Sequence, residues 1–237
     1  MNQRNQYYDI PLPERPLDPT PLEMIIYQYE LKAREFHNTK NKATAHSETE
    51  EQMAQRIAKR DRDWQHLRLE RRKISAHVML QENLALYREE NSSKTPRELL
   101  AEKHHPTKKL SRNLRATGEL QPTPIHEAHH IIPGEGRHRK KLVMESRLNL
   151  HAYGIGINDP LNGIWLRNFA KNNPDDWATP ESPPHRPIHT YNYETWIAAM
   201  FSNDNLPETV FLSRLHSVKR KLKDGSFPTN ILEKKSS

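Results

Sequence analysis

The first hundred residues place their apolar side chains at helical spacing. Between Ser47 and Glu90 no proline or glycine interrupts the chain, and apolar residues recur every three, four or seven positions. Ser47-Glu48-Thr49-Glu50 has the form of a capping box, which predicts a long helix from there to about Glu90. One narrow apolar stripe runs along it: Met53, Ile57, Trp64, Leu67, Ile74 and Val78. The stripe packs on another part of this chain or forms a docking surface for a partner. We favour packing, because Arg60 and Arg71 interrupt the seam that a coiled coil would need.

Two shorter helices are predicted on either side of this one. Thr20-Pro21-Leu22-Glu23 supplies a cap, a first-turn proline and a capping-box acid, which predicts a helix to about Phe36. Thr95-Pro96-Arg97-Glu98 repeats the signal and predicts a third helix to about Lys103. Prolines also crowd the start of the chain, where an extended arm is expected because proline removes backbone donors.

The pattern changes after residue 110. Glycine is absent before Gly118 and concentrated from there to Gly163, where it indicates turns and close backbone approach. The apolar run Ile164-Trp165-Leu166 predicts a strand, and the segment around residues 191–201 predicts a helix whose apolar face belongs to the core. We place a domain boundary near Lys109, which gives a helical extension over residues 1–109 and a second domain over residues 110–237.

Composition limits the classes of function. The 237 residues are 34% hydrophobic and 28% charged, which is polar for a globular protein. The formal net charge of +7 suits an acidic polymer such as nucleic acid, although such an excess also serves solubility. The chain has no cysteine, which excludes disulfides, thiolate metal sites and cysteine nucleophiles. Its start lacks the layout of a signal peptide and no apolar run has the length to span a bilayer, so we expect a soluble cytoplasmic chain with no membrane partner.

Two adjacent histidines, His129 and His130, stand between Glu127-Ala128 and an apolar run. In an extended strand neighbouring side chains point in opposite directions, so one imidazole can hold a metal ion while the other faces a water molecule. Either histidine could instead be a structural hydrogen-bonding residue. A second pair, His104-His105, follows a predicted helix outside this pattern. Solvent exposure explains that pair, and we expect it to take no part in a site.

Two further motifs follow. Asn162 precedes a glycine and the predicted strand, and on its own this dipeptide indicates a turn. His185 and His189 are four residues apart, a spacing that suits one metal ion on one helical face. Pro187 between them requires the helix to begin there, which places His189 inside the first turn. His185 is either a second ligand or a loop histidine of the Pro-rich run 180–187.

In this order the segments 127–133, 158–166 and 185–189 closely resemble the AHH family of nucleases in the HNH/endonuclease VII superfamily, the His-Me finger enzymes. The likeness covers about Leu110 to Gly225. It implies a fold of the α+β class, mostly α, in which a ββα-metal finger is embedded in helices and preceded by the N-terminal helical extension.

The resemblance also implies roles for the candidate residues. His129 is assigned to the metal ion and His130 to the base that activates water. Asn162 either binds the metal through its amide oxygen or orients the base, and Asn158 ranks behind it as a loop cap. His189 completes the metal shell, with His185 carried over beside it. The expected ion is a divalent metal, Mg²⁺ first, with Zn²⁺, Mn²⁺ and Ni²⁺ as alternatives.

A basic stretch follows the histidine pair and a glycine-bounded loop. Arg137, Arg139 and Lys140 are expected to contact phosphates beside the cleaved bond, which positions a strand without reading its sequence. A solvated helix start is the alternative for each of them. His126 and His138 are expected at the rim of the cleft.

The expected activity is metal-dependent hydrolysis of phosphodiester bonds by an endonuclease, with DNA favoured over RNA. AHH nucleases commonly form the toxic tips of bacterial polymorphic toxins, so the resemblance implies an antibacterial effector of a contractile (type VI) secretion system. It would be made in the producer cytoplasm and delivered without a signal peptide into the target-cell cytoplasm. Its partners would be a cognate immunity protein and a secretion adaptor or spike protein that binds residues 1–109. The alternatives are a phage or mobile-element nuclease without a toxin role, and a non-catalytic basic nucleic-acid-binding protein.

Overall fold

The computed structural model describes residues 10–40 and 48–233, and the chain divides into two compact units. Unit 1 comprises Met1–Met79 and unit 2 comprises Leu80–Ser237. The boundary expected near Lys109 therefore differs from the division that the structure makes. Glycine usage does change near residue 110, but residues 80–109 pack into unit 2 and are part of it. No helix in the described ranges combines the length and the apolar character needed to cross a membrane.

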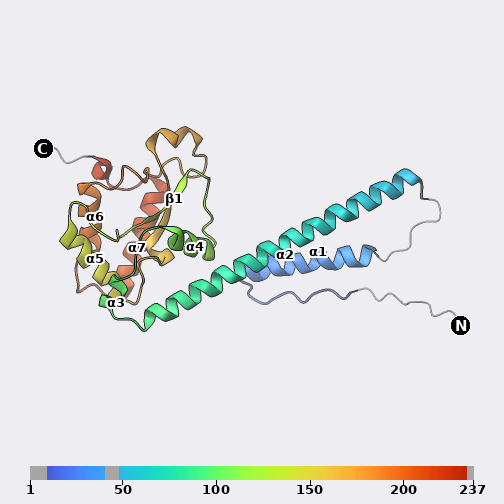
Figure 1. The fold of residues 1–237 in the computed structure, drawn as a ribbon, viewed down its shortest axis with the longest axis horizontal. Helices are drawn as coiled ribbons and strands as arrows, with labels where there is room; N and C mark the ends of the chain where they lie inside the picture. Colours follow the sequence, from blue (N-terminus) through green and yellow to red (C-terminus); the bar gives the residue numbers. More distant parts are fainter. Residues whose placement is uncertain (1–9, 41–47, 234–237) are drawn as a thin grey trace. The chain divides into compact units, whose positions relative to one another are not determined.

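Unit 1 contains the helix α1 (Pro21–Lys40) and the first part of α2 (Glu50–Ser92), drawn in blue and cyan in Figure 1. The predicted cap of α1 is present. Thr20 Oγ1 accepts the N–H of Glu23 at 3.3 Å, and the Glu23 carboxylate accepts the N–H of Thr20 at 2.7 Å. The helix ends at Lys40 and so extends one turn beyond the predicted end at Phe36.

The long helix α2 begins with a different capping pair from the one predicted. Thr49 Oγ1 accepts the N–H of Gln52 at 3.2 Å, and the amide oxygen of Gln52 accepts the N–H of Thr49 at 3.0 Å. Ser47, the predicted cap, lies outside the described residues. Part of the apolar stripe faces α1, because Trp64 and Leu67 line a hollow between the two helices together with Tyr29 and Phe36. Packing accounts for only part of the stripe, because three of its residues stay exposed: Trp64 itself at 49%, Met53 at 46% and Ile57 at 40%.

Unit 2 holds the rest of the regular structure. After the end of α2 come α3 (Pro96–Leu100), α4 (Lys108–Ala116), β1 (His126–His130), α5 (Lys140–Ala152), β2 (Gly163–Arg167), α6 (Tyr191–Phe201) and α7 (Glu208–Asp224). The Thr95–Glu98 capping box of α3 is present as predicted. The helix itself ends at Leu100, earlier than the predicted Lys103.

The strands β1 and β2 form a two-stranded antiparallel sheet, with His126 opposite Arg167 and His130 opposite Gly163. Together with α6 they make a ββα unit surrounded by helices (Figure 1), which confirms the predicted α+β, mostly α class. One prediction about this unit is wrong. The helix begins at Tyr191, capped by the side chain of Thr190, and not at Pro187. His185 and His189 consequently lie in the turn that leads into α6.

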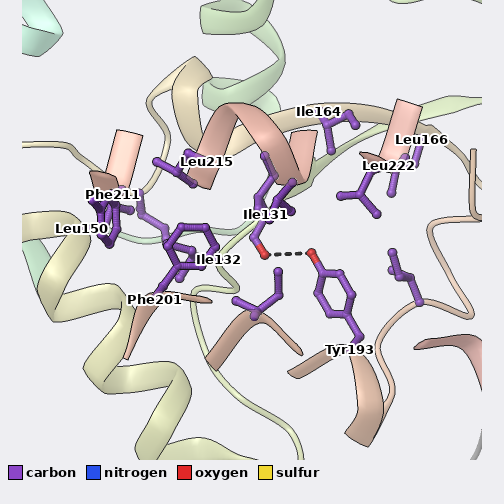
Figure 2. Packing of buried hydrophobic residues seen from close by; sticks show 14 of the residues in the cluster. Ile131, Ile132, Leu150, Ile164, Leu166, Tyr193, Phe201, Phe211, Leu215 and Leu222 are labelled. Atoms are coloured by element: carbon purple, nitrogen blue, oxygen red, sulfur yellow. Dashed lines mark hydrogen bonds between the residues drawn. The ribbon is translucent and has the colours of Figure 1, made fainter. Parts of the chain in front are cut away.

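The main core of unit 2 lies between the sheet, α5, α6 and α7. Figure 2 shows Ile131, Ile132 and Leu150 packed with Phe201 and Phe211, all fully buried. Removing aromatic and aliphatic side chains of this size from water supplies roughly 1.5–3 kcal/mol each. The chain therefore anchors the end of β1 firmly, and β1 carries the histidine pair.

Residues 80–109 join this unit through specific contacts. The guanidinium of Arg147 on α5 donates to the carbonyls of Leu100 at 3.1 Å and Glu102 at 2.8 Å, and also to that of Gly134 at 2.8 Å. Gly156 has no room for a side chain, since a Cβ there would lie 2.0 Å from the hydroxyl oxygen of Tyr87. These contacts place the segment between α2 and α4 against the loops that surround the histidine pair.

Candidate metal centre

His129 and His130 face different surroundings, as expected for neighbours on a strand. The Nε2 atom of His129 lies 2.9 Å from the hydroxyl of Tyr193 on α6. The Nε2 atom of His130 lies 3.1 Å from the amide oxygen of Asn158, in the loop before β2. The strand thus gives two adjacent imidazoles separate partners and allows them separate tasks.

Three histidines come together on the α6 side of β1. Ligand nitrogens of His129, His185 and His189 all lie within 4.8 Å of one another. The ring of His129 is 5.0 Å from that of His185 and 5.2 Å from that of His189, measured between centroids. The turn before α6 supplies the last two, so the ββα unit assembles the cluster from its first strand and from the entry to its helix. All three predicted histidine ligands are therefore neighbours.

The hydrogen bonds of Tyr193 determine which nitrogen of His129 is free. Its hydroxyl donates to the carbonyl of Ile131 at 2.7 Å, the bond drawn in Figure 2. Having used its proton there, it accepts from Nε2–H of His129. The lone pair of His129 is then on Nδ1, which is buried and has no hydrogen-bond partner among the described residues. A buried polar atom without a partner is costly, and a metal ion at this point would satisfy it.

Glu127 fixes the second histidine in the same way. Its carboxylate accepts from Nδ1 of His185 at 2.6 Å and is itself held by the guanidinium of Arg186 at 2.8 and 3.1 Å. This leaves Nε2 of His185 with the lone pair. A carboxylate behind a ligating imidazole is a common device of metal sites, because it fixes the ring and raises its basicity.

The electrostatics of the cluster keep its imidazoles neutral at pH 7. Burial lowers the pKa of His129 well below its ordinary value, and the neighbouring His185 and His189 lower it further. Burial also lowers the pKa of His189 to about 4 and lowers that of His185, against the opposing effect of Glu127. Only neutral imidazole binds a metal ion, so the residues present fit such an ion.

The surroundings of His130 differ from those of the three clustered histidines. Burial lowers its pKa to about 4, and the hydrogen bond to Asn158 offsets part of this effect. Since the amide oxygen of Asn158 can only accept, the proton of neutral His130 is on Nε2 and the lone pair is on Nδ1. An imidazole that is neutral at pH 7 and held in one tautomer can take a proton from a nearby water molecule.

The side chain of Asn162 bonds main-chain groups and not the clustered histidines or His130. Its amide oxygen accepts the N–H of Ile132 at 2.8 Å, and its amide nitrogen donates to the carbonyls of Ile132 and Ile157, both at 3.1 Å. These bonds join the segment after β1 to the loop before β2. Asn158, expected only as a loop cap, is the asparagine that contacts His130.

A hollow of about 450 Å³ opens over both histidines of the pair. His104 and His105 also line it, so the expectation that this pair lies apart from the site is wrong. The ring of His104 is 6.1 Å from that of His130, and it rests directly on Gly134, where a Cβ would lie 2.2 Å from Cγ of His104. Sequence position alone gave no sign of this, because the contact joins two loops.

The basic residues after the pair divide into two groups. Arg137 and Lys140 are exposed and line the hollow, as expected for phosphate contacts. Arg139 does not line it: its guanidinium lies over the ring of Tyr191 at 5.1 Å and donates to that hydroxyl at 2.9 Å. The buried carboxylate of Glu194 fixes the loop by accepting the N–H groups of residues 137–139 at 2.6 to 2.7 Å.

The two histidines expected at the cleft rim differ in environment. His126 is buried, with its ring nitrogens 2.8 Å from the hydroxyls of Thr123 and Thr179, and lies next to Asp176 at 3.5 Å. Its bonds make it part of a structural network. His138 is exposed and its ring meets that of Tyr191 edge-on at 6.5 Å. Neither lines the hollow over the histidine pair.

Sequence reasoning missed three groups that the structure places here. Tyr193 was assigned to the core, Glu127 received no role of its own, and Glu102, which contacts Asn158, was not considered. For Glu127 a signal existed, since it lies two residues from His129 on the same strand and therefore on the same face. Tyr193 and Glu102 are distant in sequence from their partners and had no such signal.

Comparison with known families gives a match over about the second half of the chain. Residues 110–223 match the model of AHH, described as a nuclease family of the HNH/ENDO VII superfamily with conserved AHH. In this chain the AHH motif is Ala128-His129-His130, which lies on β1. No curated protein and no solved structure matches the chain.

Proposed function

Residues 110–223 belong to the AHH family of nucleases, and from this premise we propose that the protein is a metal-dependent endonuclease that cuts DNA in preference to RNA. One observation carries the proposal. The buried Nδ1 of His129 has no partner in the described part of the chain, and it lies beside two further histidines. The neighbouring His130 is held in the tautomer that a general base requires.

The chemistry explains why both groups are needed. A phosphodiester repels nucleophiles with its negative charge, and its leaving alkoxide is poor. His129, His185 and His189 would hold a divalent ion, which supplies positive charge against the phosphate when it is bound. His130 takes a proton from water through Nδ1. Arg137 and Lys140, at the edge of the hollow, hold the phosphates on either side.

The donor set bears on which metal is bound. Mg²⁺ prefers oxygen ligands in octahedral geometry, whereas neutral imidazole suits Zn²⁺, Ni²⁺ and related ions. Three histidine nitrogens without a carboxylate in the cluster therefore favour Zn²⁺ or Ni²⁺ over the Mg²⁺ expected from the family resemblance. Glu127 does not change this, because its carboxylate is already bonded to His185 and Arg186.

The full chain can be tested on supercoiled plasmid and on RNA with each of Mg²⁺, Mn²⁺, Ni²⁺ and Zn²⁺, and with chelator. We expect nicking of plasmid that chelator stops, and no nicking by His130→Ala. His216→Ala is the matched control, because His216 is an exposed histidine of α7 that does not line the hollow. Equal cleavage by wild type and His130→Ala would overturn the proposed base, and cleavage of RNA alone would overturn the preference for DNA.

For the biological role we propose an antibacterial effector delivered by a type VI secretion system and neutralised by an immunity protein. The support is the division of the chain. Unit 1 is separate from the unit that carries the histidines, and some of its apolar residues remain exposed on α2. Such a unit suits binding to an adaptor or spike protein. Competition between producer and recipient cells tests this role, and equal killing by wild type and His130→Ala producers would contradict it.

A further inference from the structure

Each polar group of Asn158, in the side chain and in the main chain, has a hydrogen-bond partner, and these partners come from several elements. Its amide oxygen meets Nε2 of His130 at 3.1 Å. Its amide nitrogen donates to the carboxylate of Glu102 at 3.0 Å and to the carbonyl of Lys103 at 3.0 Å. The main chain of the same residue donates to the hydroxyl of Tyr87 at 3.2 Å and accepts from the amide of Asn113 at 2.9 Å. The residue therefore has little freedom to move.

Glu102 belongs to a part of the chain that precedes the family match, in the segment between α3 and α4. Its carboxylate is held by the hydroxyl of Tyr87 at 2.8 Å and by Nζ of Lys109 at 2.7 Å. Burial by itself would raise the pKa of Glu102, but the hydrogen bonds from Lys109, Asn158 and Tyr87 bring it below the ordinary value. The carboxylate is thus ionised at neutral pH and accepts hydrogen bonds only.

We propose that Glu102 is a positioning residue for His130 and that it acts through Asn158. The inference rests on the proposed function, since it concerns the base of that reaction. It also means that the nuclease site includes residues 80–109, which lie in unit 2 but outside the family match.

The physical reason is the orientation of one amide. With the Asn158 nitrogen towards Glu102 and Lys103, both of its hydrogens have acceptors and its oxygen faces His130. A flipped amide would place its oxygen against a carboxylate and a carbonyl, three acceptors without a proton among them. It would also present N–H to Nε2 of His130, which would then have to accept and would shift the imidazole proton to Nδ1. The charge of Glu102 opposes this flip and so keeps the lone pair on Nδ1, where the base needs it.

The first test is kinetic and uses the full chain with plasmid as substrate. Removing the acceptor in Glu102→Ala should lower kcat roughly ten-fold, the scale seen when groups that orient an active residue are lost, and leave KM unchanged. Glu102→Gln keeps an oxygen that can accept and should lose less. Glu119→Ala is the matched control, because Glu119 is also partly buried and bonded to lysines, Lys219 and Lys223, but the amide hydrogens of Asn158 go to Glu102 and Lys103 and not to Glu119. Its kcat should stay within two-fold of wild type, a limit of about 0.4 kcal/mol.

A double-mutant cycle separates positioning from general support of the fold. In the Asn158→Ala background, Glu102→Ala should cause no further loss, because the residue through which Glu102 acts is gone. A full additional loss there would overturn the proposal, as would an unchanged kcat in the single variant. If Glu102→Ala does not fold, the same cycle is run with Glu102→Gln, where a smaller but non-additive loss is expected.

The second test needs no catalysis. The ¹⁵N chemical shifts of the His130 ring, recorded on the metal-free full chain and assigned with His130→Ala, report which nitrogen carries the proton. We expect the proton on Nε2 in wild type and Glu119→Ala, and a mixture of tautomers in Glu102→Ala. A pure Nε2–H form in Glu102→Ala would overturn the role of Glu102. A wild-type protein that shows this shift pattern but cleaves no nucleic acid would instead count against the proposed function alone.

Discussion

The hydroxyl of Tyr193 accepts a hydrogen bond from Nε2 of His129 at 2.9 Å while it donates to the carbonyl of Ile131 at 2.7 Å. A residue in the core of the finger helix thereby determines the tautomer of the proposed metal ligand. Because the donor proton of the tyrosine is committed to the main chain, His129 has no alternative but to carry its own proton on Nε2. The buried Nδ1 lone pair follows directly from this relationship.

Tyr193→Phe tests that relationship. The phenyl ring fills the same space but accepts nothing, so His129 loses the partner that fixes its tautomer. We expect Zn²⁺ affinity, measured by calorimetry, to fall roughly ten-fold or more, and the free energy of unfolding to fall by about 1–2 kcal/mol. Tyr153→Phe is the control, since the Tyr153 hydroxyl also donates to a main-chain carbonyl, that of Leu206, and its ring packs on Phe211, away from the clustered histidines. Unchanged metal affinity in Tyr193→Phe would show that the tyrosine does not determine the tautomer of His129.

Alanine variants of the neighbouring His129 and His130 should lose different properties. His130→Ala is expected to lower cleavage by about 10² to 10⁴ while Zn²⁺ affinity stays near that of wild type, because a base lowers the barrier without holding the metal. His129→Ala should weaken Zn²⁺ binding and cleavage together, because it removes a ligand. Calorimetry and plasmid nicking on the same preparations compare them. Equal metal affinity in both variants would contradict the assignment of roles.

The pair His104-His105 should affect activity, contrary to what its sequence position suggested. Both rings line the hollow, and that of His104 rests on Gly134 beside His130. Replacing both by alanine should raise KM for plasmid roughly ten-fold, equivalent to the loss of about 1.4 kcal/mol of substrate contact. His216→Ala serves again as the control. A KM within two-fold of wild type would show that His104 and His105 do not contact the substrate.

The boundary between the units predicts where the chain can be divided. A fragment of residues 80–237 keeps Glu102, the bonds of Arg147 to the carbonyls of Leu100 and Glu102, and the contact of Tyr87 with Gly156, so it should fold and cleave plasmid at a rate similar to the full chain. A fragment starting at Lys109 loses all three and should be less stable and nearly inactive. Thermal unfolding and nicking assays of the two fragments check this. Equal activity of both would place the functional boundary back near residue 110.

Stability should depend on pH through His151, a buried residue away from the metal cluster. It accepts from Nε of Arg147 at 3.1 Å and donates to the carbonyl of Ile155 at 2.8 Å, which requires the neutral ring. Burial lowers its pKa in the folded protein to about 4 from an ordinary value of 6.5. The unfolded chain therefore binds a proton at higher pH than the folded one. This contribution is fully present above pH 6.5 and is lost as the pH falls towards 4.

The variant His151→Gln keeps an acceptor for Arg147 but does not titrate. Its free energy of unfolding should be lower than that of wild type at pH 7, and it should fall less steeply between pH 6.5 and 4. The difference in slope for one proton cannot exceed about 1.4 kcal/mol per pH unit. Urea unfolding at several pH values measures both slopes. Parallel curves for wild type and variant would show that His151 does not contribute to the pH dependence.

The sequence alone determined the local parts of this protein. Spacing and caps located α1, α2 and α3, because capping boxes act within four residues, although two helix ends and one cap were placed differently. Strand alternation separated the tasks of His129 and His130, since neighbouring side chains of a strand point apart wherever the strand lies. The class of the fold followed from the resemblance of its ordered motifs to those of the AHH nucleases.

Tertiary structure decided which distant groups meet those local parts. Asn158 rather than Asn162 contacts His130, and Glu102, Tyr193 and His104 reach the site from elements far away in the chain. The start of the second compact unit at Leu80 had no signal in the sequence for the same reason, since a change in glycine usage records turns and not contacts. Hydrogen bonds between side chains on separate elements depend on how those elements pack. Packing of a core is set by the combined shapes of many side chains, and no single motif specifies it.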